Sequence, residues 1–481
     1  MEKDSKVVEF IKGSAILVGA NMVLKAINFF LLPLYTKYLT PEDLGISDSI
    51  TTFTAFAFPL LVMGLDSAFS AFYYDKRTMK HSAKVFNTIW FSMLAASVIP
   101  FLIAFFAKPI SSILFHSEEY GYIVVVALIS VSFNLWFLPF ALFVRMENRM
   151  GIFALVNVAA SLTMIGLNVV FVSILQWGAF SLIASTAVVQ LLQLLLYLLV
   201  SKAPIGFSYY DKGLKRKMMR FALPLIPTTL AVWALNMSDR YILLAFMGEA
   251  EVGIYGIAGR FSSVVAVISS AVYMAYTAFA FNKKGDENAN TQYARILSAF
   301  FFILFALCFT VSLFGKEVIE TMTNEQYLAA YTILPGILFG QIAYGVNTIV
   351  SYGISFAKKT IYSLIATSIG AGTNIILNLI FVPIYGMEAA AHINFVGYGT
   401  MCVLGYVFSQ RLYPCDYKII RVLVTILLGY GILLFMIDWS LRCKIIVWVV
   451  VAGGGMVLFR DVLKDGRILL KAIMDRKKRT A

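Results

Sequence analysis

The chain has 481 residues, of which 60% are hydrophobic and only 14% are charged, and its mean hydropathy is +0.83. Soluble domains carry about 25% charged residues, so this composition excludes a water-soluble globular protein and indicates one that lies mainly in lipid. The formal net charge of +13 does not indicate nucleic-acid binding, because the basic residues stand in short runs between long apolar stretches.

A membrane-spanning helix needs about 20 mostly apolar residues, and fourteen stretches of the chain meet this requirement. The first of them follows a polar start and has no small-residue cleavage site, which predicts a retained span rather than a removed signal peptide. The expected fold class is an all-α integral membrane protein of about 14 transmembrane helices. The predicted spans are 13–36, 44–73, 85–107, 120–144, 152–174, 178–200, 219–246, 251–281, 294–315, 329–355, 361–381, 387–409, 419–437 and 444–459.

The distribution of lysine and arginine predicts how these spans are oriented. With the N-terminus in the cytoplasm, 31 of the 39 basic residues fall in cytoplasmic segments and five fall in external loops. Cytoplasmic loops of membrane proteins are enriched in these two residue types. We therefore expect a multi-pass membrane protein with both termini in the cytoplasm. The basic tail from Arg460 to Arg479 is expected to face anionic lipid.

The two halves of the membrane region resemble each other at an offset of about 208 residues. At this offset Asn28 aligns with Asn236, and residues 43–46 align with residues 251–254. A repeat with an even number of spans keeps its orientation in the membrane, which is typical of transporters with two lobes. The predicted organisation is two pseudo-symmetric six-helix lobes, over residues 1–205 and 206–412, followed by two extra helices and a basic tail over residues 413–481.

Six Asp, Lys or Arg residues lie more than three positions inside the predicted spans, and all of them lie in the first two spans of a half. Placing a charge in hydrocarbon costs at least about 2.5–3.5 kcal/mol, so such residues usually face a partner or a wet cavity. Lys25 and Arg260 lie near the middle of their spans and are the candidate anion-binding residues. Asn21 and Asn28 share the helix face of Lys25 and extend it into a polar stripe.

Span 7 adds Asn236 and Arg240 to the predicted substrate-binding residues. Asp48, Asp66 and Asp239 are predicted to pair with basic groups or to couple transport to an ion. Asp48 and Asp66 are five helical turns apart, which would place them on one face of an uninterrupted helix. Purely structural roles stay open: Asp48 and Asp66 as interface residues, Asp239 as an ion-pair partner, and Arg240 as a residue that snorkels to the membrane surface.

The sequence carries no signature of an enzyme. It has no HExxH, GxSxG or P-loop motif, its three histidines are scattered, and its four cysteines lack metal-ligand spacing. We expect no catalytic residue, no metal and no cofactor. A membrane glycosyltransferase or polymerase is disfavoured because the external loops are short, and a non-transporting scaffold leaves the buried charges unexplained.

Three segments carry a resemblance to a known family. They are Tyr38–Gly45, the Ser-Asp-Arg-Tyr segment Asn236–Leu243 with Val252–Tyr255 after it, and Asn378–Gly386. In these segments the chain resembles the polysaccharide transporter, or Wzx-type flippase, branch of the multidrug/oligosaccharidyl-lipid/polysaccharide exporter superfamily. The resemblance implies two six-helix lobes in a V shape, with helices 1, 2, 7 and 8 lining a central cavity. It also implies a flippase that moves undecaprenyl-pyrophosphate-linked repeat units from the inner to the outer leaflet by alternating access.

The implied partners are this lipid-linked oligosaccharide, membrane lipids, and a polysaccharide polymerase or other assembly proteins, with no nucleic acid. For the family, transport coupled to protons, to sodium or to the membrane potential is implied as well. Two alternatives stay open: a drug/cation antiporter of the same superfamily, and a flippase for the peptidoglycan precursor lipid II. The antiporters usually carry an acidic residue in the first span, where this chain has Lys25, and a lipid II flippase would be expected to carry more arginine in spans 1 and 2.

Overall fold

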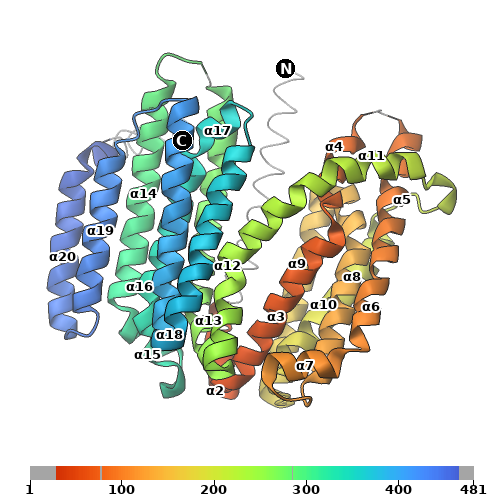
Figure 1. Ribbon diagram of the computed structural model, residues 1–481, viewed down its shortest axis with the longest axis horizontal. Coiled ribbons are helices and arrows are strands. Elements are labelled where there is room, and N and C mark those ends of the chain that lie inside the picture. The colour runs from red at the N-terminus through yellow and green to blue at the C-terminus, as the bar shows by residue number, and fades with distance from the viewer. Residues whose placement is uncertain (1–28, 76–77, 284, 465–481) are drawn as a thin grey trace, which may run out of the picture. The chain divides into compact units, whose positions relative to one another are not determined.

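The protein is helical throughout the part that the computed structural model describes, residues 29–75, 78–283 and 285–464, where no strand occurs (Figure 1). The predicted all-helical class is therefore confirmed. The α-helices are α2 (Leu32–Tyr38), α3 (Pro41–Val62), α4 (Leu65–Tyr73), α5 (Met79–Ala96), α6 (Val98–Ala104), α7 (Ala107–Phe115), α8 (Gly121–Met146), α9 (Met150–Asn168), α10 (Phe180–Val200), α11 (Lys212–Ala222), α12 (Ile226–Met247), α13 (Glu249–Asn282), α14 (Ala289–Leu313), α15 (Gly315–Met322), α16 (Ala330–Val350), α17 (Tyr352–Phe356), α18 (Ile361–Leu412), α19 (Ile419–Met436) and α20 (Leu441–Leu458). A π-helical turn, Val169–Ile174, extends α9, and short 3-10 turns occur at Phe207–Tyr209, Leu223–Leu225 and Glu325–Tyr327.

Twelve helical segments of the described residues are long and apolar enough to cross a membrane, as a multi-pass membrane protein requires. They coincide with the predicted spans from the second onward, except that the spans predicted at 361–381 and 387–409 form one 52-residue helix, α18. Inside α18, Gly386 has φ 59° and ψ −141°, so two helices meet there at a kink that glycine tolerates. The span predicted at 13–36 lies largely outside the described residues, and the total of fourteen stays a prediction.

The span predicted at 44–73 is two helices rather than one. Helix α3 ends at Val62, and both Met63 (φ 52°) and Gly64 (φ 69°) adopt left-handed conformations before α4 begins. Left-handed residues end an α-helix and redirect the chain. The expectation that Asp48 and Asp66 share a face of one uninterrupted helix is therefore wrong.

Two compact units make up the fold. Of the described residues, the first unit comprises those up to Arg260 together with Asn378–Met387, and the second comprises Phe261–Leu377 together with those from Glu388 onward. This division follows packing, whereas the predicted boundaries after residues 205 and 412 follow a sequence repeat and stay a prediction. Fully buried aromatic rings form the core of the first unit, among them Phe69 of α4, Phe86 of α5 and Phe140 of α8. In the second unit Phe301 and Phe339 are fully buried on the adjoining helices α14 and α16.

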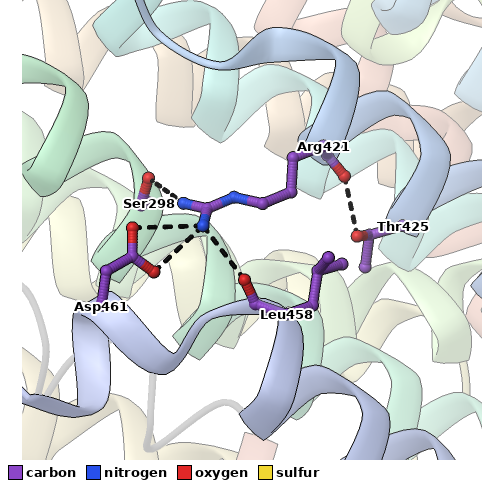
Figure 2. Close-up of polar contacts among 5 residues, drawn as sticks. All are labelled: Ser298, Arg421, Thr425, Leu458 and Asp461. Atoms are coloured by element: carbon purple, nitrogen blue, oxygen red, sulfur yellow. Dashed lines mark hydrogen bonds and ion pairs between the residues drawn. The ribbon is translucent and has the colours of Figure 1, made fainter.

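Arg421, in the first turn of α19, ties α19 and α20 to α14 (Figure 2). Its Nη1 donates to the Leu458 carbonyl at 3.1 Å and to the Asp461 carboxylate at 3.0 and 3.1 Å, and its Nη2 donates to Ser298 Oγ at 2.7 Å. The guanidinium also lies 4.3 Å from the centre of the Phe459 ring. Burial alone would raise the pKa of Asp461, but the hydrogen bonds and charge of Arg421 hold it below its usual value.

Lys444, near the start of α20, is a lysine buried within the second unit. Its side chain is 0% exposed, and its Nζ donates to both carboxylate oxygens of Glu317 at 3.0 and 3.1 Å. Glu317 lies in the first turn of α15, where the positive end of the helix dipole also favours a carboxylate. The pair therefore connects α15 to α20.

Glu317→Gln is expected to destabilise the protein by about 3–5 kcal/mol, because it leaves the Lys444 ammonium buried without its counter-charge. Thermal unfolding of the purified protein in detergent measures the loss. The matched control is the double variant Glu317→Leu/Lys444→Met, which replaces both charges by apolar groups and should recover most of the stability. A Glu317→Gln variant as stable as the native chain would contradict this account.

Candidate functional site

Direct contact between helix backbones holds the candidate site together in the first unit. A Cβ atom built on Gly45 of α3 would lie 1.7 Å from the carbonyl oxygen of Glu249, at the start of α13. A Cβ atom built on Gly253 would lie 1.9 Å from the carbonyl oxygen of Pro41. Small residues allow membrane helices to approach this closely, so these two glycines fix α3 against the first turns of α13.

The N-terminus of α3 is fixed on its other side as well. Thr40 and Asp43 form a capping box, in which each side chain accepts a hydrogen bond from the backbone of the other. The second carboxylate oxygen of Asp43 accepts from the Ala179 N–H at 2.8 Å, and Ser47 Oγ donates to the Ala179 carbonyl at 2.8 Å. The first two turns of α3 are thereby bound to the turn that precedes α10, which sets the position of the next residue, Asp48.

Asp48 and Arg260 form an ion pair between α3 and α13. Arg260 Nη2 lies 3.6 Å from Asp48 Oδ1, and the two side chains are only 15% and 16% exposed. Gly256 leaves the space for the pair, because a Cβ atom there would lie 1.9 Å from Asp48 Oδ2 and 3.3 Å from Arg260 Nη1. The Arg260 guanidinium also lies 5.8 Å from the centre of the buried Tyr35 ring, whose hydroxyl accepts from Asn168 Nδ2 at 2.9 Å.

Helix α12 brings a second acid and a second arginine to the same part of α13. Asp239 is buried, and its carboxylate accepts hydrogen bonds from the hydroxyl of Tyr255 and from the backbone N–H of Arg240. The Arg240 guanidinium approaches Gly259, where a Cβ atom would lie 3.0 Å from Nη2. Asn236, one turn earlier on α12, donates from Nδ2 to a backbone carbonyl of its own helix at 2.6 Å.

The structure thus brings together part of the predicted set. Asp48 contacts Arg260, while Arg240 and Asp239 approach the same turns of α13. Asp66 lies in the first turn of α4, beyond the break at Met63 and Gly64. The break separates it along the chain from Asp48 and from the ion pair that Asp48 makes with Arg260. Three predicted residues fall outside the described residues, namely Asn21, Lys25 and Asn28. The roles predicted for all nine residues stay predictions.

Sequence reasoning missed two features of this site. Tyr35 was not singled out, because a tyrosine in an apolar span gives no signal of an arginine on another helix. The glycines at positions 253, 256 and 259 did give a signal, since residues three apart share one side of a helix and Arg260 follows directly. This spacing indicates a close helix contact beside a buried charge.

The arrangement is suited to an anion with several oxygens. An arginine presents five N–H donors in a planar fork that matches carboxylate and phosphate groups in a bidentate manner. The Arg240 guanidinium approaches Gly259, the residue next to Arg260 on α13, and the Asp48 carboxylate offsets the charge of Arg260.

The chain is similar to proteins of known family and fold. The family model described as polysaccharide biosynthesis protein matches residues 35–332. No curated protein matches the sequence. Among solved structures, a lipid II flippase MurJ in an inward closed conformation is 17% identical, with a TM-score of 0.71 over 93% of this chain and 100% of its own.

Two structures of multidrug transporters are also similar. An inward-facing multidrug resistance MATE family transporter of the MOP superfamily is 16% identical, with a TM-score of 0.61 over 84% of this chain and 96% of its own. A transporter of the same description in an outward-facing conformation is 17% identical, with a TM-score of 0.53 over 86% of this chain and 97% of its own. At these identities the likeness is one of fold, and it shows that the chain has a fold similar to those of MurJ and the MATE transporters.

Proposed function

We propose, since the chain belongs to the polysaccharide biosynthesis protein family, that it is a flippase for an undecaprenyl-pyrophosphate-linked oligosaccharide. The repeat unit would move from the inner to the outer leaflet of the bacterial cytoplasmic membrane by alternating access. It would then enter surface polysaccharide such as O-antigen, capsule or exopolysaccharide, through a polymerase and other assembly proteins. The observation that carries this proposal is Arg260, a largely buried guanidinium paired with Asp48 beside a second arginine.

In recognising the pyrophosphate, Arg260 would exchange its contact with Asp48 for hydrogen bonds to the phosphate oxygens. The contact with Asp48 measures 3.6 Å, longer than the about 2.7–2.9 Å of a charge-assisted hydrogen bond. A pyrophosphate could bind the same guanidinium through two parallel hydrogen bonds, the stronger arrangement. Arg240 would contribute to the same anion from the neighbouring helix α12, while the polyprenyl chain stays in lipid.

Such an exchange would also provide a coupling step. Once a phosphate occupies Arg260, Asp48 becomes a largely buried carboxylate without its cation, which is costly in a low-dielectric site. Uptake of a proton or a sodium ion would neutralise it. Release of the substrate would restore the pair and expel that ion, so Asp48 is the residue we propose for ion coupling.

A lipid II flippase is the second candidate function, because the fold is similar to that of a lipid II flippase over 93% of this chain. Both substrates are glycolipids with a pyrophosphate, so the ion pair favours neither. The glycan decides between them. Competition by lipid II against the oligosaccharide lipid would support this second candidate.

The test is a transport assay with the purified full chain in liposomes. A fluorescent undecaprenyl-pyrophosphate oligosaccharide is placed in both leaflets, and the fraction accessible to a membrane-impermeant quencher is followed in time. We expect the native chain to bring lipid from the protected leaflet to the quencher faster than protein-free liposomes do. A native chain that moves a cationic dye but none of this lipid would overturn the proposal in favour of a drug antiporter.

A further inference from the structure

A second polar feature of the first unit lies outside the ion pair. It is a cavity of about 370 Å³ between α3, α8 and α10, within the range of about 300–1,000 Å³ of small-molecule sites. Its polar lining comes in pairs from the three helices: Thr51 and Thr54, Ser130 and Asn134, and Thr186 and Gln190. None of the described residues that line it is charged.

The cavity adjoins the part of α3 that carries Asp48. Thr51 follows Asp48 by three residues, so the two side chains share one side of α3, about 4.5 Å apart along the helix axis. The lining continues along α3 to Pro59, eleven residues or about 16 Å beyond Asp48. A group attached to a phosphate at Arg260 would therefore find this cavity along the same helix.

The polar groups of the cavity offer several hydrogen-bond acceptors, in addition to the N–H groups of the Asn134 and Gln190 amides. A threonine hydroxyl has one hydrogen to donate, and three of these hydroxyls already donate to backbone carbonyls: Thr51 to Ser47 at 2.8 Å, Thr54 to Thr51 at 2.9 Å, and Thr186 to Leu182 at 2.8 Å. Their lone pairs remain to accept. The Oε1 atom of Gln190 is buried and has no hydrogen-bond partner among the described residues.

A cavity lined by uncharged acceptors and donors favours a neutral ligand that can both donate and accept hydrogen bonds. A bare cation would satisfy the acceptors, but with no carboxylate in the lining its desolvation would be poorly repaid. The hydroxyl groups of a sugar and the N–H of an acetamido sugar supply donors without charge. A site built to bond such groups rejects ligands that lack them, because its own polar atoms would stay unpaired.

We infer that this cavity is the glycan subsite of the flippase, which binds a neutral, donor-rich sugar such as an N-acetylhexosamine next to the pyrophosphate. This inference rests on the proposed function and adds a division of labour to it. Arg260 binds the pyrophosphate, which every undecaprenyl-pyrophosphate lipid carries. Thr54, Thr186 and Gln190 form hydrogen bonds with the sugar and so distinguish one sugar from another. The cavity, rather than the ion pair, then sets which glycan is carried.

Two lipids test the inference by binding to the purified full chain in detergent. One is undecaprenyl pyrophosphate, and the other is the same lipid carrying one N-acetylglucosamine. Gln190→Leu and Thr54→Val should each weaken binding of the sugar lipid about 3- to 10-fold, the effect of one hydrogen bond, and leave the sugar-free lipid unchanged. Thr400→Val is the matched control, because Thr400 makes the same hydroxyl-to-carbonyl bond on α18, outside the cavity.

The outcomes separate this inference from the proposed function. If the native chain binds neither lipid, the proposed function fails, and the inference fails with it. If the native chain binds both and the two cavity variants lose no preference for the sugar lipid, only the subsite is overturned. An equal loss for both lipids would likewise overturn it, since that result shows a general defect and no recognition of the sugar.

Discussion

Arg260→Ala is expected to lower the rate of lipid-linked oligosaccharide transport at least about 30-fold and to abolish surface polysaccharide in cells. The guanidinium is the proposed pyrophosphate ligand, and removing one partner of a buried, hydrogen-bonded charge pair costs about 2–5 kcal/mol. Transport in liposomes and polysaccharide on the cell surface measure the loss, each normalised to the amount of protein in the membrane. Arg145→Ala removes an exposed arginine of the same unit and should leave both unchanged.

A structural role for Arg260 must be separated from substrate binding, because Arg260→Ala also leaves Asp48 without its cation. The double variant Arg260→Ala/Asp48→Asn removes both charges and should recover stability without recovering transport. Transport that returns with stability would show that the arginine only holds the fold. Normal polysaccharide from Arg260→Ala alone would contradict the proposed anion site.

Gly45→Ala is expected to destabilise the first unit by about 2 kcal/mol or more, the second large effect. Its Cβ atom would lie 1.7 Å from the carbonyl oxygen of Glu249, and a backbone atom cannot turn aside as a flexible side chain can. The helices α3 and α13 would have to separate, which would also spread Asp48 from Arg260. Thermal unfolding in detergent measures the first consequence, and the transport assay measures the second.

The matched control for this clash is another helical glycine, Gly151→Ala on α9. A Cβ atom on Gly151 meets nothing within 4 Å, so the variant should be neutral or slightly stabilising. If Gly45→Ala unfolds at the same temperature as Gly151→Ala, the backbone contact between α3 and α13 does not hold the site.

The helices were predictable from sequence because membrane spans are defined by length and hydropathy, which are local properties. Interruptions within a span were harder to predict. Met63 and Gly64 end α3 without a polar break, so the span predicted at 44–73 ran across them. The bend of α18 at Gly386, by contrast, falls between the spans predicted at 361–381 and 387–409. A left-handed turn costs little at glycine, and the apolar residues on both sides of Met63 and Gly64 leave a hydropathy pattern nothing to detect.

The site was predictable in its residue types but only partly in its partners. The sequence shows Asp48 and Arg260 as charges within membrane spans, and such charges require a partner. Whether they contact each other depends on how α3 packs against α13, which the sequence does not show. That contact had a visible trace. Gly45 and Gly253 occupy equivalent positions of the predicted repeat, and in the structure each glycine lets its helix approach a backbone carbonyl of the other. Tyr35 left no such trace, because its role depends on the distance to Arg260 alone.

The buried lysine of α20 has a consequence for the order in which the chain is assembled. Ribosomes make proteins from the N-terminus, so the segment with Glu317 leaves the ribosome more than a hundred residues before Lys444. By the time the ammonium of Lys444 reaches the protein interior, its carboxylate partner can already be in place on α15. A truncation that ends before α20 would remove Lys444 and leave the partly exposed carboxylate of Glu317. Loss of α15, by contrast, would leave the buried ammonium of Lys444 without its carboxylate partner. Helix α20 therefore depends on the earlier helix α15 for its charge balance, and synthesis from the N-terminus proceeds in the direction that this dependence requires.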